Sequence, residues 1–85
     1  MYFVYFLESK KDSSKHYIGY SSNLKQRLSR HNSGLVRFTK KNRPWKIIYF
    51  EGYLNKQDAI GREKFLKGGS GWKFLKKQLK HYFSQ

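Results

Sequence analysis

Runs of aromatic and β-branched residues alternate along the chain with short polar segments, and this pattern predicts three strands. The first strand is expected over residues 2–7, where the apolar run ends at the turn-forming segment 8–14. A second short strand follows at 16–20, so the two strands most simply form an antiparallel hairpin. The third, at 45–50, has the near-continuous apolar character of a strand covered on both faces.

A helical period of apolar residues predicts three helices. The first begins after three possible N-cap residues at 21–23 and ends before the Asn-Ser-Gly sequence at 32–34. The second is expected between the capping residues near 55–58 and the glycines at 68–69, and the third starts at Ser70. The predicted order is β-β-α-β-α-α. We therefore expect an α+β fold in which helices flank a three-stranded, mostly antiparallel sheet.

Length and composition limit the class of protein. With 85 residues the chain is expected to form a single domain over residues 1–85. It has 7 Phe, 7 Tyr and 2 Trp but no cysteine, so an aromatic core must stabilise it instead of disulfides. No apolar run approaches the roughly 18 residues of a membrane-spanning helix, and the first residues are the reverse of a secretory signal. These features lead us to expect a cytoplasmic protein without a membrane segment.

The charge balance indicates a polyanionic partner. The chain has 19 Lys and Arg against 5 Asp and Glu, a net charge of +14 at pH 7, which is best explained by contact with the phosphates of a nucleic acid. Solubility alone and an anionic membrane surface are weaker explanations, because mixed charges suffice for solubility and the cations are not gathered on one amphipathic helix. The residues expected to bind phosphates are Lys10, Lys11, Lys15, Arg37, Lys40, Lys41, Arg43, Lys73 and Lys77.

Three polar residues fall where the helical period predicts a buried face. Arg27 and His31 lie within or at the border of the arc that two leucines define on the first helix. Glu63 lies among the apolar positions of the second helix. Burying an unpaired charge costs several kcal/mol, so Arg27 and Glu63 must pair with each other, reach water, or form a site.

Two tyrosines of the predicted hairpin are also candidates for chemistry. Alternation along the first strand places Tyr5 on one face with Phe3 and Leu7, and the second strand can place Tyr17 beside it. A buried tyrosine is usually a core ring whose hydroxyl has a partner. The tyrosines alone therefore do not indicate a site.

In combination, these residues resemble the GIY-YIG nuclease superfamily, and most closely its small stand-alone bacterial members. The resemblance covers nearly the whole chain, from Tyr2 to about Leu79. The matching motifs are Phe3-Val4-Tyr5, Tyr17-Ile18-Gly19, Arg27 with His31 four positions later, the strand from Trp45 to Glu51, and Glu63 within Ala59-Ile60-Gly61-Arg62-Glu63-Lys64. The first triplet departs from Gly-Ile-Tyr but keeps its tyrosine.

The resemblance implies a metal-dependent endonuclease that hydrolyses DNA phosphodiester bonds, one strand per site. It also implies that DNA structure, more than sequence, directs cleavage, and that DNA repair or recombination is the setting. The implied catalytic residues are Tyr5, Tyr17, Arg27, His31 and Glu63, with Glu63 as the ligand of Mg²⁺ or Mn²⁺.

The implied roles agree with the chemistry of phosphoryl transfer, which builds negative charge on the phosphate oxygens. A single carboxylate, Glu63, suits an ion that keeps water and phosphate in its other positions. Arg27 can hold a phosphate through two hydrogen bonds. Tyr5 is expected to accept the proton of the attacking water, because nearby cations would lower its pKa. His31 would assist, and Tyr17 would orient water or phosphate.

One departure leaves other functions open. Many members carry an asparagine after the glutamate, and none follows Glu63, so Ser70 or Gln78 would have to replace it. This difference favours the alternative of a non-catalytic basic nucleic-acid-binding module that keeps the nuclease fold. A third alternative is an RNA-associated protein that inherited the scaffold. DNA is the expected partner and RNA remains open, as does assembly into a dimer or with a partner protein.

Overall fold

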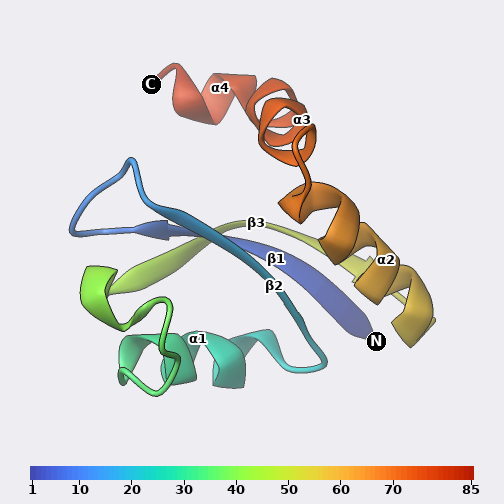
Figure 1. Ribbon diagram of the computed structural model, residues 1–85, viewed down its shortest axis with the longest axis horizontal. Coiled ribbons are helices and arrows are strands. Elements are labelled where there is room, and N and C mark those ends of the chain that lie inside the picture. The colour runs from blue at the N-terminus through green and yellow to red at the C-terminus, as the bar shows by residue number, and fades with distance from the viewer.

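The computed structural model describes residues 1–85 and contains a three-stranded antiparallel sheet with helices on both faces (Figure 1). The strands are β1 (Tyr2–Ser9), β2 (His16–Ser21) and β3 (Trp45–Tyr53), in the order β2-β1-β3. Strand β1 pairs antiparallel with both neighbours. The predicted fold class, the hairpin and the order of the elements are confirmed.

The helices are α1 (Leu24–Asn32), α2 (Lys56–Lys67), α3 (Gly71–Gln78) and α4 (Lys80–Phe83), and Lys40–Asn42 form a 3₁₀ turn. Asn23 and Asn55 cap α1 and α2, because each side chain accepts a hydrogen bond from a backbone N–H of the first turn. Gly34 follows α1 with φ of 82°, a conformation that favours glycine. The last predicted helix is divided at Leu79 into α3 and α4. The longest helix has 12 residues, and none has the length and apolar character needed to cross a membrane.

The third strand differs from the expectation of full cover on both faces. Strand β3 lies at an edge of the sheet, most of its side chains are only half-buried, and Phe50 is exposed. The strand buried on both faces is β1, which occupies the centre. An apolar run does not reveal which strand is central when helices from both layers also contact the edge strand, as α1 and α2 do here.

Alternation along β1 separates two apolar clusters. Val4 and Phe6 point to the face covered by α2 and α3, where the cluster includes Ala59, Leu66 and Leu75. Tyr5 and Leu7 point to the other face and pack with Trp45 against the leucines of α1. The period of the strand thus places the hydroxyl of Tyr5 beneath α1.

Candidate active site

A chain of hydrogen bonds joins β1, α1 and the loop that follows α1. The Tyr5 hydroxyl lies 2.9 Å from Nε2 of His31, and Nδ1 of His31 lies 2.7 Å from Oγ1 of Thr39. The Thr39 hydroxyl donates in turn to the carbonyl oxygen of Val36 at 3.3 Å. All three side chains are buried. The inward position predicted for His31 is confirmed.

The direction of these bonds follows from the protonation state of His31. Burial, followed by the charges of Arg27 and Arg30, lowers the pKa of His31 to about 4, so the imidazole is neutral at pH 7. Because the Thr39 hydroxyl already donates to a carbonyl, it accepts from Nδ1–H of His31. Nε2 is therefore the acceptor, and Tyr5 donates its hydroxyl proton to it.

The pKa of Tyr5 moves in the direction opposite to the expectation. Burial raises the pKa of Tyr5, the neighbouring Tyr17 and Glu63 raise it further, and Arg27 lowers it by less than these together. The sequence did not reveal that the Tyr5 ring lies in the core, where removal of the phenolate from water outweighs one nearby cation. Tyr5 is consequently a protonated donor at neutral pH. The charges of Arg27 and Glu63 act on this hydroxyl in opposite directions, Arg27 lowering its pKa and Glu63 raising it.

Gly19 makes room for the ring of Tyr5. The two residues are partners in the register of β1 and β2. A Cβ at Gly19 would clash with the Tyr5 hydroxyl, and it would lie 2.7 Å from Cζ of Tyr5 and 3.1 Å from Cε2 of Tyr17. The glycine of the Tyr17-Ile18-Gly19 motif thus has a packing function, which is to let Tyr5 lie across the backbone of β2.

Tyr17 and Glu63 are connected through Lys67. The ring of Tyr17 lies 5.0 Å from that of His31 and 6.5 Å from that of Tyr5, measured between centroids. Nζ of Lys67 lies 5.2 Å from the centroid of the Tyr17 ring and 3.4 Å from Oε2 of Glu63, its ion-pair partner one helical turn away. The glutamate of α2 and the tyrosine of β2 therefore share one cation.

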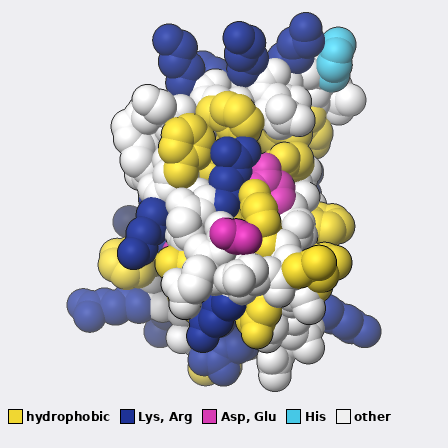
Figure 2. Space-filling view, turned by 90° about the vertical axis from the view of Figure 1, so that its right-hand side faces the viewer, with side chains coloured by type: hydrophobic (Ala, Val, Ile, Leu, Met, Phe, Trp, Pro, Cys, Tyr) yellow, Lys and Arg dark blue, Asp and Glu magenta, His cyan; other side chains and the backbone are white.

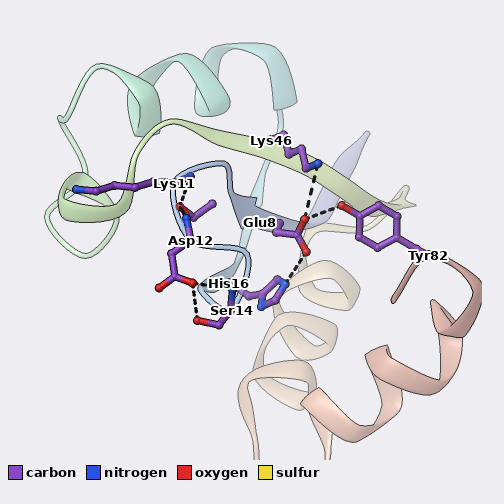
Figure 3. Close-up of polar contacts among 8 residues, drawn as sticks. Glu8, Lys11, Asp12, Ser14, His16, Lys46 and Tyr82 are labelled. Atoms are coloured by element: carbon purple, nitrogen blue, oxygen red, sulfur yellow. Dashed lines mark hydrogen bonds and ion pairs between the residues drawn. The ribbon is translucent and has the colours of Figure 1, made fainter. Parts of the chain in front are cut away.

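The two glutamates of the sheet each have several polar partners. The carboxylate of Glu51 accepts hydrogen bonds from two tyrosine hydroxyls and two from the guanidinium of Arg62. Glu8 accepts from Tyr82 at 2.6 Å, contacts Nε2 of His16 at 3.0 Å and lies 3.7 Å from Nζ of Lys46 (Figure 3). Both carboxylates are thus held by several neighbouring side chains.

Glu63 differs from both. Its side chain is 18% exposed, and its only polar partner is Lys67. The prediction that it points inward is confirmed. No group of three or more His, Cys, Asp or Glu side chains is arranged to hold a metal. Glu63 therefore fits the requirement of an ion bound by one protein carboxylate with water and phosphate in its other positions.

Arg27 lies on α1, half-buried, and lines a polar cavity of about 270 Å³ together with Ser21, Ser22, Arg30 and Lys56. Three cations beside hydroxyl groups form a suitable environment for a phosphate. The direct pair between Arg27 and Glu63 that the sequence left open does not form. Arg27 and Tyr17 also line different cavities, and the buried Tyr5 hydroxyl lies within the electrostatic reach of both.

The nine residues predicted to bind phosphates are all exposed; seven lie in the loops before β2 and before β3, and two lie on α3. The loop between β1 and β2 contacts the basic loop 35–44, since Lys10 N–H donates to the carbonyl of Pro44 and Nζ of Lys11 to that of Lys41. Lys73 and Lys77 lie on α3 instead. Figure 2 shows Lys and Arg side chains gathered at the end of the molecule that α3 and α4 form.

Two residues of this region, Lys67 and Thr39, were not predicted from the sequence to belong to the site. Lys67 could have been found, because it follows Glu63 by one helical turn, a spacing at which opposite charges pair. Thr39 gave no signal, since nothing in the pattern of the loop relates it to His31. Neither proposed replacement of the family asparagine contacts Glu63. Ser70 is exposed before α3, and Gln78 lines a cavity with Phe74 and Lys77.

Comparison with known proteins gives the family. The model of the GIY-YIG catalytic domain matches residues 1–78. The chain belongs to the GIY-YIG family. It is 38% identical over 68 residues to a UPF0213 protein of Clostridium perfringens, and the match covers 79% of this chain and 71% of the relative. A UPF0213 protein of Staphylococcus haemolyticus is 34% identical over 76 residues, or 88% of this chain and 90% of the relative.

A third relative, from Pediococcus acidilactici, is 44% identical over 63 residues, and the match spans 71% of this chain and 64% of the relative. The resemblance inferred from the motifs is thus confirmed. Membership of the GIY-YIG family supports, at the level of the superfamily, a nuclease that hydrolyses nucleic acid, and such nucleases generally use a divalent metal.

Proposed function

We propose that this protein is a divalent-metal-dependent endonuclease that hydrolyses DNA phosphodiester bonds, cutting one strand per site. The observation that carries the proposal is the state of Glu63, a shielded carboxylate with unoccupied lone pairs in a chain of net charge +14. Its cation partner, Lys67, also covers Tyr17. Tyr5, Tyr17, Arg27, His31 and Glu63 are the proposed catalytic residues.

Arg27 binds the scissile phosphate in this proposal. Its cavity holds two further cations, so the transition state, in which charge grows on the non-bridging oxygens, is stabilised more than the ground state. Glu63 would hold Mg²⁺ or Mn²⁺, and the bound ion would neutralise phosphate charge and lower the pKa of water. An ion at Glu63 would compete with Lys67, the present ion-pair partner of this carboxylate.

In this proposal Tyr17 orients the attacking water and Tyr5 accepts its proton. Tyr17 lines an open groove and orients the attacking molecule. As the water oxygen bonds to phosphorus and the bond to the leaving oxygen breaks, the water proton passes to Tyr5, whose own proton moves to Nε2 of His31. The relay avoids a lasting phenolate on Tyr5, whose pKa is raised. Its acceptor, His31, has a pKa of about 4 and is a weak base, so the step would depend on the metal ion to lower the pKa of the attacking water. Thr39 keeps His31 in the tautomer that can accept.

A nicking assay on supercoiled and branched DNA tests the proposal. With Mg²⁺ or Mn²⁺ the natural protein should produce nicked circles, and Glu63→Gln should lower the rate by at least about 100-fold, since it removes the negative charge but keeps the shape. Asp58→Asn is the matched control, because Asp58 is an exposed carboxylate on the same helix. Equal cutting by all three proteins, or by none, contradicts the proposal.

A specific difference favours a second candidate, a binding module without turnover. No asparagine follows Glu63, and neither Ser70 nor Gln78 contacts it. For such a module, binding to DNA or structured RNA would weaken with salt while no metal-dependent product forms. Preference for branched DNA, a role in repair, a cytoplasmic location and action as a monomer or dimer stay predictions.

A further inference from the structure

A groove of about 340 Å³ runs along the edge of β2 where α2 meets α3. Phe6, Ile18 and Leu66 form its floor, and His16, Tyr17, Lys67 and Trp72 border it. Its size is that of a small-molecule pocket, and most of its lining is apolar. The proposed chemistry uses only Tyr17 from this set. The remaining aromatic lining is therefore unexplained.

Trp72 lies on α3 and is 43% exposed, while its indole packs against three other rings. Its centroid lies 4.8 Å from that of His16, 5.7 Å from that of Phe83 and 5.8 Å from that of Phe6. Phe6 stacks behind His16 at 5.1 Å. A partly exposed ring that its neighbours hold in place loses little entropy when a flat ligand stacks on it.

The charges around the groove select the kind of ligand. No carboxylate lines it, and Lys67 is the one Lys or Arg among its lining residues. Lys67 also forms an ion pair with Glu63, so the groove lies next to the proposed catalytic residues. A ligand that combines a flat ring with a nearby negative charge would match both the exposed indole and Lys67. A nucleotide of the bound strand meets these conditions, with its phosphate toward Lys67 and its base on Trp72.

We propose that the groove binds one unpaired nucleobase next to the phosphate that is cut, so the preferred substrate has an unpaired nucleotide at that position. The inference rests on the proposed function, since it identifies the scissile strand by Glu63. In a paired duplex the faces of each base are covered by its neighbours, and only edges are accessible. A stacking surface beside the site therefore favours single strands, flaps or bulges over intact duplex.

Intrinsic fluorescence offers a direct test, because the two tryptophans differ in exposure. Trp45 is 3% exposed and Trp72 is 43% exposed, so stacking should quench Trp72 alone. We would titrate Glu63→Gln protein, without divalent metal, with a single-stranded oligonucleotide, a bulged duplex and a fully paired duplex. Quenching is expected with the first two ligands and not with the third. Trp72→Phe should remove the signal.

Affinity supplies the second measurement. Trp72→Leu keeps an apolar side chain but removes the stacking surface, and it should weaken binding to the single strand by about 10-fold or more, with little change for the paired duplex. Phe38→Leu is the control, since Phe38 is 84% exposed in the basic loop and outside the groove. Thermal melting checks that each variant is folded, and Trp72→Phe, which retains a ring, should bind nearly as well as the natural protein.

The outcomes separate the two proposals. Equal loss of affinity for paired and unpaired DNA in Trp72→Leu, absence of quenching, or a larger effect of Phe38→Leu would overturn the base site. Natural protein that cuts no DNA, while Trp72 still distinguishes unpaired from paired strands, would support the base site and contradict the endonuclease. Cutting that is equally fast on paired and unpaired DNA, and unaffected by Trp72→Leu, would support the endonuclease and contradict the base site.

Discussion

Gly19 sets how close the Tyr5 ring can come to the second strand. The absence of a Cβ lets the phenol cross the backbone of β2 and reach His31. Any larger residue must displace either the ring or the strand, because Tyr5 is held in the core on its other sides. The geometry of the Tyr5–His31 hydrogen bond thus depends on a residue that carries no chemistry.

Gly19→Ala should lower the free energy of unfolding by about 1 to 3 kcal/mol, as overpacking does in a close-packed core. Gly61→Ala is the matched control, because no atom lies within 4 Å of the Cβ it would add and the residue lies inside α2. Alanine there should raise stability by about 0.5 to 1 kcal/mol. Urea unfolding measures both changes, and a shift of the same sign in the two variants would show that the close approach is unimportant.

Periodicity made several individual residues predictable and left others hidden. Arg27, His31 and Glu63 stand out because each is polar at a position where the helix turns inward. Thr39 contacts His31 only because the loop after α1 folds back, and no local pattern encodes that path. The raised pKa of Tyr5 was missed for a related reason, since the depth of a side chain is a property of the assembled core.

At the scale of elements, Glu8 links α4 to the hairpin of β1 and β2. The Glu8 carboxylate, at the end of β1, accepts a hydrogen bond from Tyr82 of α4 and contacts His16 of β2 (Figure 3). Burial raises the pKa of Glu8, but the hydrogen bonds from Tyr82 and His16 and the charge of Lys46 outweigh it, so the pKa lies below its ordinary value. The ionised carboxylate is therefore the form that holds α4.

Tyr82→Phe should lower the free energy of unfolding by about 1 to 2 kcal/mol at pH 7, because a hydrogen bond to a charged acceptor is lost. A carboxyl with a depressed pKa stabilises the fold above its ordinary range and loses this contribution as pH falls. The difference between variant and natural protein should accordingly shrink below about pH 4. Tyr20→Phe, at a half-buried tyrosine without a side-chain hydrogen bond, is the control for denaturation curves across this range. A difference that stays constant with pH would contradict the role of Glu8.

The order of the elements along the chain was predictable from the sequence, but which elements lie next to one another in space was harder to predict. The strands and the caps at Asn23 and Asn55 follow from local patterns. The central place of β1 depends on pairing between distant segments, and the contact of α4 with Glu8 joins residues 74 positions apart. Neither has a signature within a few residues of the chain.

For the molecule as a whole, the exposed cations should dominate binding to DNA. If about five phosphates are contacted, the logarithm of the binding constant should fall against the logarithm of salt concentration with a slope near −4.5. Replacing Lys73 and Lys77 together by glutamine should reduce the magnitude of that slope by up to about 2. Fluorescence anisotropy over a range of salt concentrations measures it. A slope near zero would show that the charge serves another purpose.

The dimensions of the molecule have a consequence for how it selects a target. Its longest extent is 32 Å. At roughly 3.4 Å per base pair, this spans about nine base pairs, less than one full turn of B-form DNA. One copy of the chain can therefore contact phosphates of less than one turn of duplex at a time, and in the proposed endonuclease the choice of target would rest on the few nucleotides around the cut.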